Sequence, residues 1–203
     1  MEQVNNLRKL EAEDYLSELK REWPEIFRIY EKLHRGETLN TLDMEWIDEL
    51  SKEIGWKADA VMDEIKNLDK EPSSRVEKYQ KLFEEYYKEA KELKEKKDYK
   101  QAGEKIWGAI TALIKLYVAK KEIPIEVWDH AKLFKFISNN MSDEPIKLSD
   151  GSKTSLRKAF YNLLSNGNML HKNFYENDLD EKSFNEYFNT VTELIDAIKK
   201  IVI

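Results

Sequence analysis

The sequence predicts an all-α protein built from two helical domains. Only six Gly and four Pro occur among 203 residues, whereas 36% of the chain is charged. Much of that charge is Glu and Lys, which lose little rotamer freedom in helices. Apolar residues recur at helical spacing along most of the chain, and no segment keeps the alternation typical of a half-buried strand. Five Trp, ten Tyr and eight Phe supply large side chains of the kind that disordered chains lack.

Four helices are expected in the first part of the chain. Pro24 suits the first turn of a helix, and Gly36 and Gly55 are typical stop signals just after a last turn. Together with the apolar spacing, these residues predict helices over about 4–21, 24–35, 41–54 and 57–68. The run Pro72-Ser73-Ser74 then interrupts the pattern. We therefore expect a domain of residues 1–72 followed by one of residues 73–203.

Five helices are expected in the second part. Ser74 can cap a long first helix, and Asp98 marks a short connection to the second helix. This second helix is the most apolar of the chain, and Ile123-Pro124 ends it. Residues 140–153 contain Pro145, Asp150-Gly151 and several Ser and Asp, a composition typical of a loop. The expected helices cover about 74–97, 99–121, 127–139, 154–175 and 181–202.

Composition excludes several kinds of site. The chain has no Cys, and its three His, at 34, 130 and 171, are too far apart for a spaced metal motif. We therefore expect no metal and no cofactor. No apolar run approaches the roughly twenty residues of a membrane helix, and the first residues lack the features of a secretion signal. The expected location is the cytoplasm, without membrane contact. Abundant Lys and Glu without Cys fit a thermophile.

Charge is divided unequally along the chain. Residues 1–75 contain 12 Lys and Arg against 19 Asp and Glu, a net charge of −7. Residues 76–203 contain 22 basic and 21 acidic residues, a net charge of +1. A surface that binds phosphate is therefore expected in the second part, and the acidic first domain is expected to contact a protein partner.

Residues 44–68 have the form of a helix-turn-helix. The stretch MEWIDELSKEIGWKADAVMDEIKNL combines a helix, a Gly at the turn and a second helix after about three residues. The second helix carries Asp59, Asp63 and Glu64 against Lys57 and Lys66. Carboxylates there would oppose attraction to DNA phosphates. A hairpin used for packing or protein contact is the preferred interpretation, and a helix-turn-helix transcriptional regulator is an alternative.

A stripe of small residues follows the helix expected over residues 99–121. Glu104 and Lys115 lie at the edge of this stripe, so the face could line a ligand-binding site. Another helix could approach the stripe closely, either inside one bundle or at the seam of a homodimer. The small residues of the candidate seam are Ala102, Gly108, Ala109 and Ala112.

A second candidate face lies on the helix expected over residues 154–175. Histidine is the side chain that ordinarily changes its charge near neutral pH, so a polar face that contains His171 could bind a ligand or handle a proton. The alternative is that His171 is structural, as a His beside aromatic side chains usually is. The residues that share this face by helical spacing are Arg157, Tyr161, Leu164, Asn168, His171 and Tyr175.

The second domain resembles a known family. A long helix is followed by DYKQAGEKIWGAITALIK and, near the end, by LHKNFYEN. In this order they resemble the archaeal PaREP family within the HEPN superfamily, over residues 74–203. The resemblance implies a HEPN-like helical bundle that dimerises. HEPN relatives include metal-independent ribonucleases as well as proteins that bind nucleotides or partner proteins.

The chain departs from the catalytic pattern that the resemblance implies. Active members carry an Arg four to six residues before a His, but positions 164–166 hold Leu164, Ser165 and Asn166. An Arg fork suits the charge that develops on phosphate during RNA cleavage, so its loss removes a large electrostatic contribution. Arg157 lies fourteen residues before His171, about 21 Å along a straight helix, and cannot replace it. Lys105, or a Lys from another subunit, is the remaining candidate cation.

The preferred function is therefore a non-catalytic, dimeric module that binds a protein, a nucleotide or RNA. The candidate ligand residues are Glu104, Lys105, Lys115, Arg157, Tyr161, Asn168, His171 and Tyr175. An alternative from another class is a metal-independent RNase or toxin–antitoxin component that uses His171.

Overall fold

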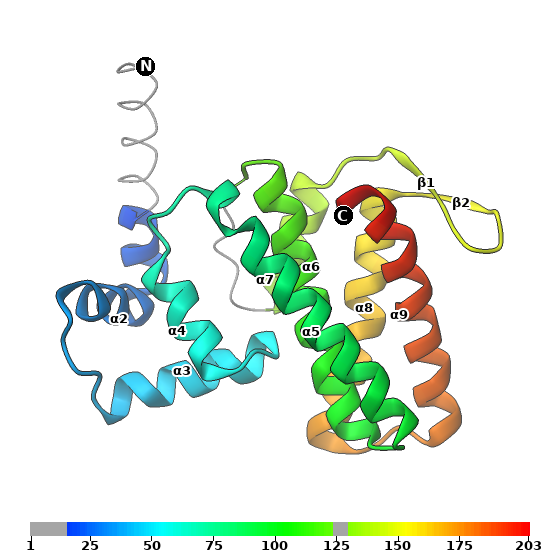
Figure 1. Cartoon of the computed structure of the whole chain (residues 1–203), viewed down its shortest axis with the longest axis horizontal. Coiled ribbons are helices and arrows are strands. Elements are labelled where there is room, and N and C mark those ends of the chain that lie inside the picture. Colours follow the sequence, from blue (N-terminus) through cyan, green and yellow to red (C-terminus); the bar gives the residue numbers. More distant parts are fainter. Residues whose placement is uncertain (1–15, 124–129) are drawn as a thin grey trace. The chain divides into compact units, whose positions relative to one another are not determined.

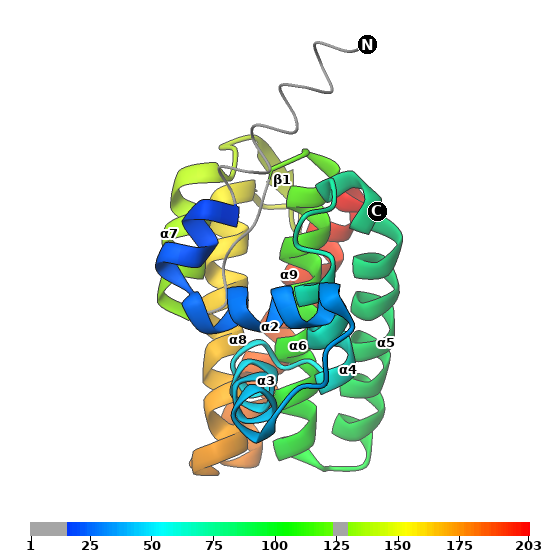
Figure 2. The same cartoon turned by 90° about the vertical axis from the view of Figure 1, so that its left-hand side faces the viewer.

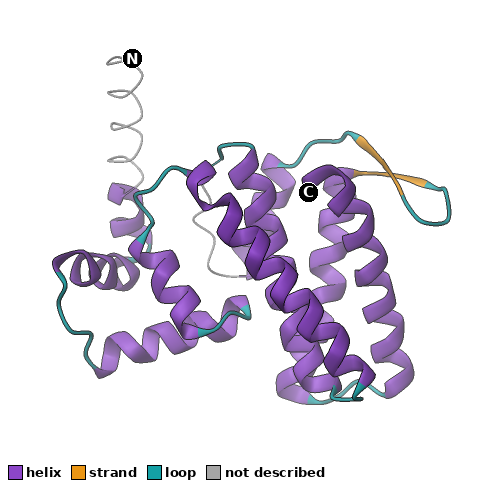
Figure 3. Cartoon of the chain, viewed as in Figure 1, coloured by secondary structure: helices purple, strands orange, loops and turns teal. Residues whose placement is uncertain are grey.

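The computed structural model describes residues 16–123 and 130–203, and in this part of the chain helices joined by loops are accompanied by one small hairpin (Figures 1 and 3). The predicted all-α class is confirmed. None of the described helices is long and apolar enough to cross a membrane. Contacts divide the chain into two compact units, and the division falls between Glu71 and Pro72. It coincides with the Pro-Ser-Ser break in the sequence.

The first unit contains three helices with both ends among the described residues. They are α2 (Pro24–Arg35), α3 (Thr41–Ile54) and α4 (Ala58–Lys66). Residues 16–22 are also helical, and the rest of the helix expected over 4–21 lies outside the described residues. Gly36 and Gly55 end α2 and α3 with φ of 68° and 70°. This left-handed backbone conformation is easy only for glycine. The α3–α4 pair occupies the place of the expected helix-turn-helix.

A buried carboxylate ties α2 to α3. The Asp43 side chain accepts hydrogen bonds from Arg28 Nε at 3.1 Å, from Lys32 Nζ at 2.5 Å and from the Asn40 backbone at 3.0 Å. Asn40 in return caps the Asp43 backbone N–H, which completes a capping box at the start of α3. Burial alone would raise the pKa of Asp43, but the bonds from Lys32, Asn40 and Arg28 outweigh burial and lower it.

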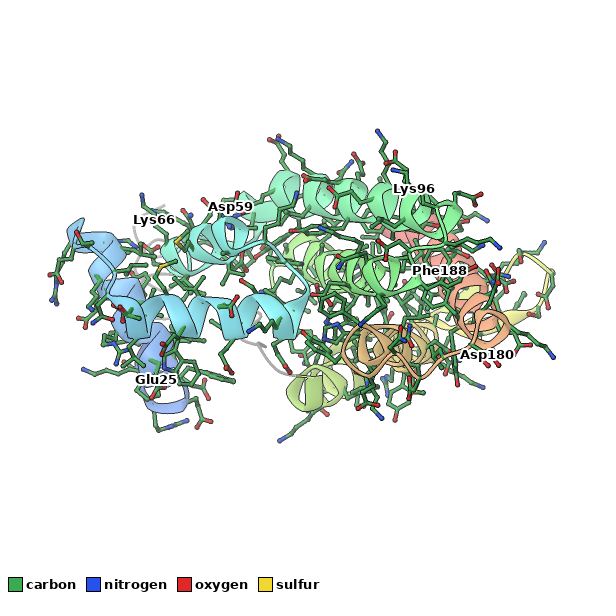
Figure 4. All side chains as sticks on the ribbon, turned by 90° about the horizontal axis from the view of Figure 1, so that it is seen from below. Glu25, Asp59, Lys66, Lys96, Asp180 and Phe188 are labelled. Carbon is green, nitrogen blue, oxygen red and sulfur yellow. The ribbon has the colours of Figure 1, made fainter. Side chains whose placement is uncertain are left out.

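The second unit is a four-helix bundle. After a short 3₁₀ turn, η1 (Pro72–Arg75), its long helices are α5 (Val76–Glu95), α6 (Tyr99–Lys120), α8 (Leu156–Glu176) and α9 (Glu181–Val202). Figures 1 and 2 show them running alternately up and down, with α7 (His130–Asn140) beside α8. In Figure 4, where α8 and α9 are seen nearly end-on, side chains such as Phe188 occupy the space between the helices. Short connections join α5 to α6 and α8 to α9, whereas α6 is joined to α8 by residues 121–155, which include α7 and the hairpin.

Helix α6 lies at the centre of this bundle and contacts α5, α8 and α9. Its residues from Ile106 to Ala119 are all buried, as expected for a helix that is apolar around most of its circumference. Its backbone also lies very close to α8. A Cβ added at Gly103 would stand 2.3 Å from the carbonyl oxygen of Leu170, and one at Gly167 would stand 2.3 Å from Ile110 Cδ1. Glycine is required where helices approach this closely.

Helices α5 and α9 contact each other through aromatic side chains of α5 and charged side chains of α9. Lys199 of α9 lies over the rings of Phe83 and Tyr87, at 5.7 and 5.8 Å from the ring centroids. The Tyr87 hydroxyl donates to Asp196 at 3.4 Å. Burial, together with the Asp196 charge, raises the pKa of Tyr87 far above its ordinary value. Tyr87 is therefore a neutral hydrogen-bond donor at all physiological pH values.

The segment expected to be a loop over residues 140–153 instead contains most of a β-hairpin (orange in Figure 3). Strands β1 (Pro145–Lys147) and β2 (Lys153–Ser155) pair antiparallel, with Ile146 opposite Thr154. Gly151 has a φ of 86°, which the turn requires. The prediction of a loop here was wrong because three-residue strands are too short to show an alternating pattern.

The contact between Gly103 and Leu170 leads to a first prediction. Gly103→Ala should lower the free energy of unfolding by about 1–3 kcal/mol, because the new methyl group meets backbone that cannot move without shifting a helix. Gly167→Ala is the matched control, since its methyl group meets the rotatable end of Ile110. Both changes gain the same helix propensity. Urea unfolding followed by circular dichroism should show the larger loss for Gly103→Ala, and equal losses would contradict the argument.

The Asp43 cluster leads to a second prediction. Asp43→Asn should lower the stability of the first unit by about 1–3 kcal/mol, because Lys32 and Arg28 lose their buried counter-charge. The folded-state pKa of Asp43 is lowered, so its stabilising contribution is present above the unfolded value of about 3.9 and is lost as the pH falls through the folded value. Amide hydrogen exchange in α3 measures both the loss of stability in the Asp43→Asn variant and the loss of stability of the wild type as the pH falls. Asp48→Asn, at an exposed surface pair with Lys52, should leave exchange nearly unchanged.

Candidate functional site

The structure brings residues from both predicted faces into a single cluster. Glu104 and Trp107 are one turn apart on α6, and His171 and Tyr175 are one turn apart on α8. We call these four side chains the His171 cluster. The spacing of three residues on α6 and four on α8 places each pair on one side of its helix. The close approach at Gly103 and Leu170, one position before Glu104 and His171, brings the two pairs together.

A short hydrogen bond joins the two helices within this cluster. His171 Nδ1 lies 2.8 Å from Glu104 Oε2. An ionised carboxylate only accepts hydrogen bonds, so Nδ1 carries the proton and donates it to Glu104. A carboxylate on one ring nitrogen fixes both the tautomer and the orientation of the imidazole. Glu104 is therefore the residue that positions His171.

Aromatic rings hold His171 on two sides. Trp107 stacks on it with ring centroids 5.2 Å apart and planes 18° apart, and Tyr175 meets it edge-on at 5.3 Å and 90°. The His171 residue is only 4% exposed, and 16% of the Glu104 side chain is exposed. Tyr175 itself is 50% exposed. The imidazole is thus packed among protein side chains, with Tyr175 at the outer edge of the cluster.

The other candidate ligand residues lie apart from this cluster. Arg157 stands at the first turn of α8 and donates to the Met141 carbonyl at 3.0 Å. Tyr161 is exposed and meets Phe134 edge-on at 5.1 Å. Lys115 is buried 5.9 Å from the Tyr79 ring centroid. Asn168, one turn before His171, is half-buried. The face predicted on α8 is thus a line of residues rather than one site.

Two of the three basic residues predicted near the site are paired with carboxylates. Arg157 Nη2 lies 3.0 Å from Asp143, and Lys105 Nζ lies 2.8 Å from Glu89. Lys105 also stands over the Tyr86 ring, at 5.0 Å from its centroid. Each pair neutralises a charge that a bound phosphate would need, so neither cation is preorganised for an anionic ligand.

The three positions where the family pattern would place an Arg offer no cation. Leu164 is fully buried in the core. Asn166 donates its side-chain amide to the Asn162 carbonyl at 2.7 Å, within α8, and Ser165 is exposed. None of these three positions therefore supplies a cation beside His171.

The small residues of the predicted homodimer seam are used inside the single chain. Ala102, Ala109 and Ala112 have no exposed surface, and Gly108 is also buried. These residues allow the neighbouring helices to pack closely around α6. A seam between two copies through them would require the bundle to open.

Sequence reasoning identified Glu104 and His171 separately but did not join them, and it assigned Trp107 only to the core. The spacing of Glu104 and Trp107, three residues apart on one helix, was the available indication of a shared face. Among the residues that the structure describes, no group of three or more His, Asp or Glu side chains could hold a metal ion.

A comparison with protein families finds a match over most of the second unit. The model of the archaeal PaREP1/PaREP8 family matches residues 78–195, a range that includes the whole His171 cluster. No curated protein and no solved structure matches the chain.

The geometry of the cluster leads to a third prediction. His171→Ala should lower the free energy of unfolding by about 2–4 kcal/mol, because it leaves a cavity beside Trp107 and removes the donor from Glu104. His171→Asn should recover part of this loss, since its Nδ2 amide can replace Nδ1 as the donor. Lys172→Ala, at an exposed neighbouring position, is the control. Equal losses for the Ala and Asn variants in urea unfolding would show that the hydrogen bond contributes nothing.

Proposed function

This chain belongs to the archaeal PaREP1/PaREP8 family, and we propose that it is a non-catalytic interaction protein whose helical bundle is a scaffold for protein partners. The observation that carries this proposal is the packing of His171. A general acid or base must come within hydrogen-bond reach of the group whose proton it moves. His171 is instead stacked on Trp107, bonded to Glu104 and almost wholly buried. The wider HEPN resemblance stays a prediction.

The chemistry of RNA cleavage supports the same conclusion. General acid–base catalysis alone contributes typically about 10²–10⁴-fold, and stabilisation of the developing phosphate charge is usually the larger contribution. The guanidinium nearest to His171 along α8 belongs to Arg157, about 21 Å away along the helix, where it pairs with Asp143. With Glu104 holding the imidazole, the cluster supplies an oriented His without an adjacent Arg.

The pairing of the basic side chains favours a protein partner over a nucleotide or RNA. Arg157 and Lys105 are matched with carboxylates, and Lys172 pairs with Glu176 at 3.1 Å. A phosphate ligand would have to break these pairs before it could use their charge. The acidic first domain, residues 1–72, is proposed as a second contact surface for a protein partner, and we propose that the protein acts as a homodimer in the cytoplasm.

The alternative of a metal-independent RNase is tested directly. Wild type and His171→Asn should both leave single-stranded RNA intact in the presence of EDTA, because neither has an Arg to hold the phosphate. The Asn variant is used because it keeps the donor to Glu104 and so preserves the fold. Cleavage by the wild type that disappears in a folded variant would overturn the proposal in favour of the nuclease.

The preference for a protein partner has its own test. RNA binding, followed by fluorescence anisotropy, should be weak and should lack the steep salt dependence that several phosphate contacts produce. A protein that neutralised about six phosphates would lose roughly a thousandfold in affinity between 50 and 200 mM salt. A slope of that size would replace the proposed protein partner with RNA.

A further inference from the structure

Exposed apolar side chains of the first unit gather at the start of α3. In the described part of this unit, the large apolar side chains that are exposed are Leu42 and Met44, at 50% and 42%. Trp46, one turn after Leu42, is half-buried. Trp is among the residues that protein interfaces enrich and that most often dominate their binding energy. The start of α3 is therefore a candidate interaction surface.

Leu42 and Trp46 share one side of α3 with two carboxylates. Glu45 and Glu49 are exposed, and the four residues follow the spacing i, i+3, i+4 and i+7 of one helix side. We call Leu42, Glu45, Trp46 and Glu49 the α3 face. A different side of the helix packs against α2 and α4 through Asp43, Ile47, Leu50 and Ile54. The α3 face is thus not needed for packing within the first unit.

The α3 face is presented on a rigid support. Asp43, between Leu42 and Met44 in the sequence, is buried and bonded to Arg28 and Lys32 of α2. The capping box at Asn40 fixes the first turn of the same helix. A surface that is already ordered loses little conformational freedom when it binds, which favours association.

The charge of the α3 face is one-sided. Asp48 of the same helix pairs with Lys52. Glu45 and Glu49 are one turn apart, so these two exposed carboxylates repel each other. A cationic side chain placed between them would relieve this repulsion, and an anionic one would increase it. The net charge of −7 over residues 1–75 adds a long-range attraction for cations.

We propose that the α3 face binds a basic amphipathic helix of a partner protein. This rests on the proposed function and names the chemistry of the partner that the first domain contacts. Leu42 and Trp46 bury against apolar side chains of the partner helix, and Lys or Arg side chains beside these pair with Glu45 and Glu49. The spacing i, i+3, i+4 and i+7 is the one through which an amphipathic helix makes its contacts.

Other classes of ligand match only part of the α3 face. Nucleic acids and membranes rich in anionic lipid carry the same sign of charge as Glu45 and Glu49, so they are repelled. A small cation would meet the carboxylates but would leave Leu42 and Trp46 in water. A basic segment with an apolar side satisfies the carboxylates and the apolar pair together.

A synthetic peptide tests the proposal on the full chain. The probe is a fluorescent helix-forming peptide of Leu and Lys, about 18 residues or five turns long, with Leu at the spacing of one helix side. Anisotropy should give a dissociation constant of about 1–100 μM, as expected for a small interface. A peptide with Glu in place of Lys, and one with the same residues in scrambled order, should each bind at least about tenfold more weakly.

Single substitutions at exposed positions locate the surface. Leu42→Gln and Glu49→Gln should each weaken binding of the Lys peptide at least about threefold, because each removes one kind of contact. The matched controls are Met44→Gln, two residues from Leu42 and so on another side of α3, and Asp59→Asn, exposed on α4. Both controls should bind within about twofold of wild type. Equal effects of the test and control substitutions would overturn the assignment to the α3 face.

A charge exchange gives a result that loss of the fold cannot imitate. The double variant with Glu45→Lys and Glu49→Lys should bind the Lys peptide at least about tenfold more weakly and the Glu peptide at least about tenfold more tightly. Lys is as good a helix former as Glu, and both positions are exposed, so circular dichroism should show an unchanged helix content. A folded double variant that still prefers the Lys peptide contradicts the proposal.

The outcomes distinguish this proposal from the proposed function. A Lys peptide that does not bind wild type at up to about 500 μM, or that binds no better than the Glu peptide, overturns the α3 face as a site for a basic helix. RNA cleavage, or RNA binding with a steep salt dependence, would overturn the proposed function. Neither of those results would change the binding of the peptides to α3.

Discussion

The close approach of α6 and α8 is the constraint on which the rest of the second unit depends. Gly103 lies against the Leu170 carbonyl so tightly that no side chain fits between them. A helix held this close on one side, and covered by α5 and α9 on others, must be small or apolar almost all round. The alanines of α6 and its unbroken burial from Ile106 to Ala119 follow from that position.

The His171 cluster is a consequence of the same contact. Glu104 and His171 each follow the touching pair by one residue, so the approach of the backbones sets their separation. A largely buried carboxylate and a buried imidazole are costly when unpaired and acceptable when bonded to each other. The pair therefore fixes the register of α6 against α8, because sliding either helix by a turn would leave both groups without their partner. This structural role accounts for the placement of His171 without requiring catalysis.

Much of the fold could be predicted because its determinants are local. Pro24, Gly36 and Gly55 act within their own turns, and Asp98 caps α6 by accepting from the Gln101 N–H at 3.2 Å. The hairpin at β1 and β2 was missed, since a pairing that depends on contact between short segments leaves no period in the sequence. The same limit applies to Glu104 and His171, which are 67 positions apart. Helical spacing shows which residues share a face, but it does not show which face lies opposite. The small residues of α6 were open to two interpretations for that reason, and the single chain already uses all of them.

Polar groups that are already hydrogen-bonded within the protein are not available to a ligand, so they limit where binding can occur. His171 is bonded to Glu104 between α6 and α8, and Tyr87 is bonded to Asp196 at the surface of the bundle, and groups that are already bonded have little left to offer a ligand. The exposed side chains lie outside, and among them are Tyr161 and Tyr175 of α8 and the charged Lys158. Exposed aromatic side chains are among the residues that protein interfaces enrich, whereas a phosphate site would collect cations. The distribution of paired and exposed groups therefore supports the proposed protein-binding surface.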